Sequence, residues 1–135
     1  MAQTTSRTGG QLRLELTAAN VGAVIPASGS TDVLTVPVHG MTNLGVQIVV
    51  GVHALDAFAI KARFHRDADF VTLYSTAGAF NTPAGLLIGA SGDLTSQAVG
   101  TGWFILDVRG LYEVRVSASG SVDDTTSISL YANGS

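Results

Sequence analysis

Three histidines are the residues of this sequence best suited to hold a metal ion. They are His39, His53 and His65, and no two of them stand at the short His-x-His or His-x₃-His spacings that present two imidazoles to one ion. We therefore predict no metal site. We interpret His39 as a turn residue, and His53 and His65 as residues at strand ends or on the surface.

The carboxylates also lack the arrangement that calcium or glycoside chemistry needs. Aspartates are paired in Asp67-Ala68-Asp69 and Asp123-Asp124, but a calcium loop has a denser acidic pattern. We expect these aspartates to shape turns. The two glutamates, Glu15 and Glu113, each alternate with an apolar stripe, so a solvated face is favoured over an acid–base pair in a groove.

Nucleophile and phosphate motifs are absent as well. The string nearest to a nucleophile elbow, Gly89-Ala90-Ser91-Gly92-Asp93, has the wrong spacing and no helical pattern after it. Gly100-Thr101-Gly102 runs into a strand pattern, which indicates a turn and not a phosphate loop. The sequence therefore predicts no catalytic residue and no cofactor, and we expect a protein that is not an enzyme.

Four aromatic residues could stack on sugar rings: Trp103, Tyr74, Tyr112 and Tyr131. Tyr74 and Tyr112 are in phase with apolar neighbours, which predicts core positions. Trp103 lies on the face opposite Phe104, so it is the one aromatic residue that we would test as a sugar contact, and packing in the core or between subunits is the favoured interpretation.

Period-two alternation of apolar and polar residues predicts the elements that position these side chains. It is clearest in residues 102–135, and no stretch has a helical period. We predict an all-β protein, an antiparallel, jelly-roll-like β-sandwich of about eight strands. Pro37 places its strand at an edge or a bulge. The predicted strands are residues 12–16, 34–38, 46–50, 58–64, 70–74, 104–108, 112–118 and 128–130.

We predict two parts: a flexible N-terminal arm at residues 1–10, which is polar and ends in two glycines, and a single domain at residues 11–135. No internal repeat is visible in the sequence. The N-terminus lacks the apolar run of a signal peptide, and no segment is apolar enough to span a bilayer, so we expect no membrane association.

Charge is unusually scarce. Charged residues make up 13% of the 135 residues, with one lysine, and the net charge is −3, against about 25% charged residues in ordinary domains. Such a surface favours a subunit that is covered by copies of itself or by a partner. The six arginines are dispersed, which argues against direct nucleic-acid binding. There are no cysteines, so disulfides are excluded.

The C-terminal strands resemble the closing strands of small structural proteins in tailed-phage virions. The similar segment is WFILDVRGLYEVRVSA at residues 103–118, followed by a polar turn and a final Thr/Ser-rich strand. This resemblance implies a head decoration (cement) protein, commonly trimeric, which binds the major capsid protein in the virion. It implies no catalytic residue.

Four residues are our candidates for protein–protein contact: Arg7, Trp103, Ile105 and Leu111. Arg7 lies in the predicted arm, and the other three are apolar residues outside the main stripes. Two alternatives remain open from the sequence, a structural role in the tail or neck and a carbohydrate- or receptor-binding module.

Overall fold

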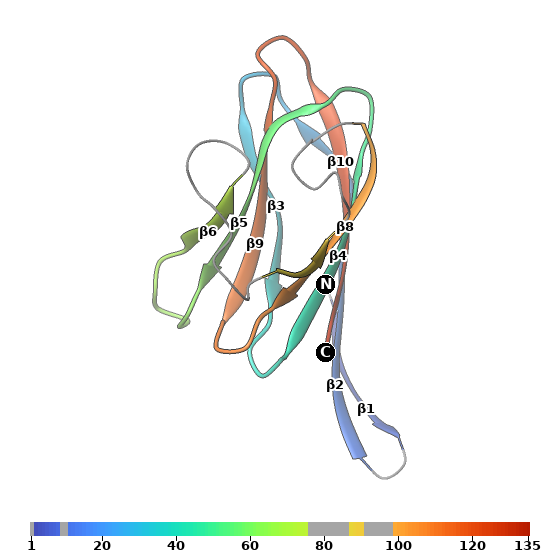
Figure 1. Ribbon diagram of the computed structural model, residues 1–135, viewed down its shortest axis with the longest axis vertical. Helices are drawn as coiled ribbons and strands as arrows, with labels where there is room; N and C mark the ends of the chain where they lie inside the picture. The colour runs from blue at the N-terminus through green and yellow to red at the C-terminus, as the bar shows by residue number, and fades with distance from the viewer. Residues whose placement is uncertain (1, 9–10, 76–86, 91–98) are drawn as a thin grey trace.

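The protein is an antiparallel β-sandwich (Figure 1), as the sequence predicts. The computed structural model describes residues 2–8, 11–75, 87–90 and 99–135, and side chains from residue 15 onward except in 87–90. These ranges hold ten strands and no helix. The strands beyond the predicted eight are β1, in the segment predicted to be an arm, and the short β7.

The two sheets have different sizes. The six-stranded sheet has the order β1(Ala2–Thr8), β2(Gln11–Ile25), β10(Thr126–Gly134), β4(Asn43–Val50), β8(Gly100–Asp107) and β7(Leu87–Ala90). The four-stranded sheet has the order β3(Ser30–Pro37), β9(Glu113–Gly120), β5(Leu55–Arg63) and β6(Val71–Ser75). Pro37 ends the edge strand β3, which confirms its predicted position at an edge.

The core lies between the two sheets and takes alternate residues from each strand. Phe104 is fully buried, and its ring stacks on Phe58 with centroids 6.4 Å apart. The Tyr74 ring also packs against Phe58, with ring centroids 5.8 Å apart. Tyr74 is buried, which confirms the core position predicted from its phase. Thr126 is a buried polar residue whose hydroxyl contacts the Gly51 carbonyl oxygen at 2.8 Å and accepts the His53 N–H at 3.0 Å. Its polar group is therefore satisfied without water.

The sandwich contains a structural repeat that the sequence does not show. β3 and β4 begin at residues 30 and 43, and β8 and β9 begin at residues 100 and 113, so their numbers differ by 70. β5 and β10 follow in the same order. The strand order β8–β4–β10 in one sheet matches β3–β9–β5 in the other. The two halves are thus related by an approximate two-fold axis, and each half places its middle strand in the sheet of the other.

Two reciprocal hydrogen bonds show this symmetry at the turns. The Val38 N–H donates to the Tyr112 carbonyl, and the Val108 N–H donates to the Thr42 carbonyl, both at 3.0 Å. Each turn places a glycine in the left-handed region that other residues rarely adopt, Gly40 with φ 81° and Gly110 with φ 84°. Residues 38–42 and 108–112 therefore form equivalent turns, and each connects a strand of one sheet to a strand of the other.

The N-terminal segment forms a hairpin with the start of β2. β1 pairs with β2 in the register Ala2↔Thr17 to Thr8↔Gln11, whereas β10 pairs with β2 only from Leu16 onward. The hairpin extends past the end of the sandwich (Figure 1). The projecting arm thus includes the first residues of β2 as well as residues 2–8, and its predicted flexibility stays a prediction.

The β8–β9 turn carries the clearest electrostatic feature of the described residues. The Arg109 guanidinium donates to both Asp107 carboxylate oxygens, at 2.9 and 2.6 Å, and the Arg109 N–H donates to Oδ1 at 3.2 Å. These hydrogen bonds to the charged form lower the pKa of Asp107 from 3.8 to about 2.

We expect this turn to weaken only in strong acid. Because the pKa of Asp107 is lower in the folded state, its stabilising effect is fully present above pH 3.8 and is lost as the pH falls toward 2. Carboxyl carbon chemical shifts should give a midpoint near 2 for Asp107, and Arg109→Gln should move it back toward the ordinary value. An ordinary midpoint in the native protein would contradict the ion pair.

Candidate docking surface

The three histidines have different neighbours in the fold. The His39 ring is tilted against the Tyr112 ring, with centroids 5.5 Å apart, the His53 Nε2 lies 3.9 Å from Asp124 Oδ1, and His65 lies beside Asp67. Among the described residues, no group of three or more histidines and carboxylates comes together. The structure also contains, in its described ranges, no helix long and apolar enough to cross a membrane.

The outer face of the six-stranded sheet is the surface that differs most from an ordinary solvated face. Strand pairing aligns two rows across it. One row contains Ala19, Tyr131, Gln47 and Trp103, and the next contains Thr17, Asn133, Gly45 and Ile105. We call these eight residues the docking face; none of them is charged.

This face combines exposed aromatic rings with a hollow. Trp103 is 45% exposed and Tyr131 is 43% exposed, on either side of Gln47. Between them and their neighbours lies an open hollow of about 770 Å³, lined by all eight residues of the face. Gly45 contributes no side chain at the centre of its row, which leaves this space open. The nearest charged residue along β8 is Asp107, two positions beyond Ile105, so charge appears only at the rim.

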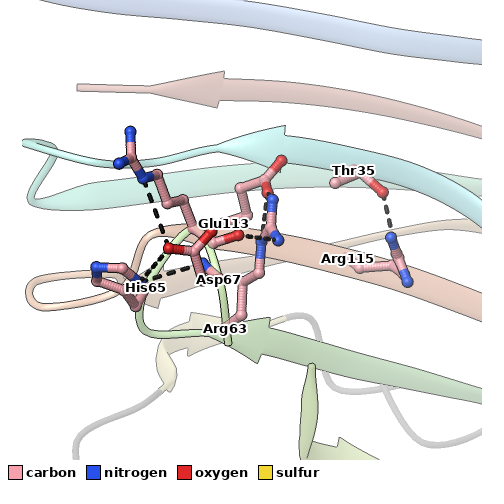
Figure 2. Close-up of polar contacts among 7 residues, drawn as sticks. Thr35, Arg63, His65, Asp67, Glu113 and Arg115 are labelled. Carbon is pink, nitrogen blue, oxygen red and sulfur yellow. Dashed lines mark hydrogen bonds and ion pairs between the residues drawn. The ribbon is translucent and has the colours of Figure 1, made fainter. Parts of the chain in front are cut away.

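The outer face of the four-stranded sheet has the opposite chemistry (Figure 2). Arg63 forms an ion pair with Glu113, and Arg115 donates to the Thr35 hydroxyl at 3.1 Å. Arg115 also lies 3.6 Å from Asp32 and stacks over the Phe70 ring at 3.9 Å from its centroid. The arginines of this face are thus paired with carboxylates, Arg63 with Glu113 and Arg115 with Asp32.

The approximate two-fold axis allows the two faces to be compared position by position. In the four-stranded sheet, Asp32–Ser117–Ala59 and Thr35–Arg115–Lys61 are aligned rows. Their counterparts in the docking face are Trp103–Gln47–Tyr131 and Ile105–Gly45–Asn133. The same strand positions thus carry Asp, Arg and Lys on one sheet, and Trp, Gly and Asn on the other. The backbone accepts charge at these positions, so the fold does not impose the uncharged character of the docking face.

The structure separates the four residues predicted to make protein contacts. Trp103 and Ile105 both lie on the docking face. Arg7 lies in β1, where its side chain is outside the described part of the chain. Leu111 is only 7% exposed and belongs to the core beside the β8–β9 turn. It is the counterpart of the buried Met41, so it is held inside the sandwich and not presented to a partner.

Sequence reasoning did not select Tyr131, Gln47 and Gly45 for this surface. Tyr131 alternates with the buried Leu130 and Ala132, so period two already placed it outside. Only strand order brings it into one row with Trp103, because β10 and β8 flank β4. Gly45 carries no chemical signal in the sequence.

Comparisons with known proteins add a remote structural likeness. No family model matches this sequence, and no curated protein matches it. Among solved structures, the crystal structure of the SPBc2 prophage-derived protein YomS matches with a TM-score of 0.49 and 12% sequence identity. The match covers 89% of this chain and 96% of that one.

Proposed function

We propose that this chain is a non-enzymatic structural protein of a phage virion, a head decoration (cement) protein that binds and stabilises the major capsid shell. The docking face carries this proposal. It is a wide, uncharged sheet surface with two half-exposed aromatic residues, on a chain whose equivalent surface in the other sheet is charged.

The chemistry of the docking face suits a protein surface. Tyrosine and tryptophan are enriched among the residues that dominate binding energy at protein interfaces, and charged residues are depleted from interface centres. Trp103 and Tyr131 fit the first property, and the eight uncharged residues fit the second. Covering this face removes apolar area from water without stripping water from an ion.

The resemblance of residues 103–118 to closing strands of virion proteins supports the same proposal, because the tryptophan that begins this segment is one of the two aromatic residues of the docking face. A decoration protein also gains from repetition. Many weak contacts on one shell act together, so each copy needs only modest affinity.

The proposal is tested by adding the purified protein to empty shells assembled from the major capsid protein of the same genome. We expect co-sedimentation with the shells and a higher shell unfolding temperature. Trp103→Ser should weaken binding at least about tenfold, the effect of losing about 1.4 kcal/mol at a contact centre. Thr35→Ser, on the opposite sheet, is the matched control and should bind as the native protein does.

A second candidate function, glycan binding, is favoured by one observation. Trp103 and Tyr131 stand two strands apart in a single row, with the Gln47 amide between them, which is an arrangement that could hold a neutral sugar chain. Failure to bind shells, together with Trp103-dependent binding on a glycan array, would replace the capsid proposal by this one. Binding to tail or neck preparations instead of shells would move the same surface to another part of the virion.

A further inference from the structure

The β1–β2 hairpin has an unpaired edge on each side. β1 pairs with β2 and with no other described strand. On the other side, β10 reaches β2 only at Leu16, so the described residues leave the β10-facing edge of residues 11–15 unpaired. Both edges project beyond the sandwich (Figure 1). A strand edge presents a row of N–H and C=O groups that can pair with another chain.

A hairpin of this kind is not expected to be stable by itself. Two strands alone form a marginally stable unit in water, because they offer no second layer to bury an apolar side. In the sequence, Leu12 and Leu14 precede the fully buried Leu16 at a spacing of two, so these three positions lie on one face of the strand. The sandwich core covers position 16, whereas the hairpin carries positions 12 and 14 past it.

We propose that the hairpin pairs with the hairpins of other copies of this chain and so builds a closed ring of strands. The outer edge of β1 in one copy pairs with the free edge of residues 11–15 in the next copy. The order β1–β2–β1–β2 then continues around the ring, and every neighbouring pair is antiparallel, as within one hairpin. In this arrangement both free edges are paired, and positions 12 and 14 share one side of the ring with their β1 partners at positions 7 and 5.

The two different edges favour a ring of identical copies over other occupants. A two-fold dimer through β1 alone would leave the edge of residues 11–15 unpaired. A single added strand from another protein would likewise cover one edge and not the other. Joining unlike edges of identical subunits is a head-to-tail contact, which closes into a ring when the rotation permits. Three copies supply six strands, and an assembly of identical copies is consistent with the covered subunit expected from the low charge of the chain.

Light scattering after size exclusion tests the ring. We expect the full chain to have three times its 13.8 kDa mass, and the chain lacking residues 2–8 to be monomeric. The shortened chain should keep its β circular dichroism, because pairing of β2 with β10 begins at Leu16. A monomeric full chain, or an oligomer that survives the deletion, would overturn the proposal.

Cysteine cross-linking distinguishes the ring from a two-fold pair, because the native chain has no cysteine. The two variants are Ser6→Cys, in β1, and Arg13→Cys, in β2. Each variant is oxidised alone, and a mixture of the two reduced variants is oxidised in parallel. The ring predicts cross-links in the mixture and none between chains of the same variant. Cross-linked dimers of Ser6→Cys alone would show β1–β1 pairing and refute the ring.

The ring is independent of the docking face. Trp103→Asp should leave the oligomeric mass unchanged, whereas deletion of residues 2–8 should abolish it. An intact ring that fails to bind shells would count against the proposed function and leave the ring standing.

Discussion

Replacing Leu111 by Asp is expected to unfold the domain. Leu111 is 7% exposed and packs in the core behind the β8–β9 turn, and none of the contacts described there would neutralise a carboxylate. The substitution removes a buried leucine, which alone costs about 2–5 kcal/mol, and adds the cost of burying a charge. The sum is comparable to the whole stability of a domain of this size, about 5–15 kcal/mol. Urea denaturation followed by circular dichroism measures the effect.

The same substitution at Trp103 is the matched control. Asp32 occupies the corresponding position in the other half of the sandwich, so an aspartate is compatible with this backbone. Trp103→Asp should therefore cost no more than about 1 kcal/mol of stability while it abolishes docking. A folded Leu111→Asp protein with native stability and impaired assembly would show that Leu111 is a surface contact, contrary to its position in the structure.

Placing an arginine at Gly45 is expected to abolish binding to the capsid shell without unfolding the protein. A Cβ at Gly45 would have the Asn133 carbonyl oxygen as its nearest neighbour at 3.7 Å, an ordinary contact distance. Arg115 stands at the equivalent position of the other sheet, so the strand accepts this side chain. The new side chain would fill the hollow between Trp103 and Tyr131 and introduce a charge without a partner. We expect affinity to fall about 100-fold, which corresponds to about 2.7 kcal/mol.

Ser119→Arg provides the control for Gly45→Arg. It adds the same charge to the outer face of the four-stranded sheet, next to Ser117 and the network of Arg115 and Asp32. Co-sedimentation with shells should be close to native for this variant. Equal loss of binding in both variants would mean that net charge, and not the docking face, controls attachment. Native affinity of Gly45→Arg would exclude the hollow from the interface.

The two-fold relation between the halves provides an internal comparison for the docking face. An uncharged sheet surface by itself has many explanations, because folded proteins expose much apolar area. Here the same scaffold is present twice in one chain, and the second copy carries Asp32, Lys61 and Arg115 at positions where the first carries Trp103, Asn133 and Gly45. The backbone therefore does not impose this difference, which supports the proposal that a partner covers the docking face.

The sequence by itself determined the β class, the edge position of Pro37 and the outward direction of Trp103 and Ile105. Period-two alternation decides these features locally, since each residue of a strand faces opposite to its neighbours. The same reasoning failed for Leu111, because a turn has no such period: the glycine at position 110, with φ 84°, redirects the chain and returns Leu111 to the core.

Only the tertiary structure decided which strands lie side by side. The row of Trp103, Gln47 and Tyr131 joins β8, β4 and β10, whose pairing depends on contacts distant in sequence. The internal repeat was equally hidden, because equivalent strand positions in the two halves share burial and often differ in residue type. Val38 and Val108 are both buried valines, whereas the equivalent buried positions 41 and 111 carry Met and Leu. Long-range pairing, which a local pattern cannot encode, brought uncharged residues of β2, β10, β4 and β8 together on one face.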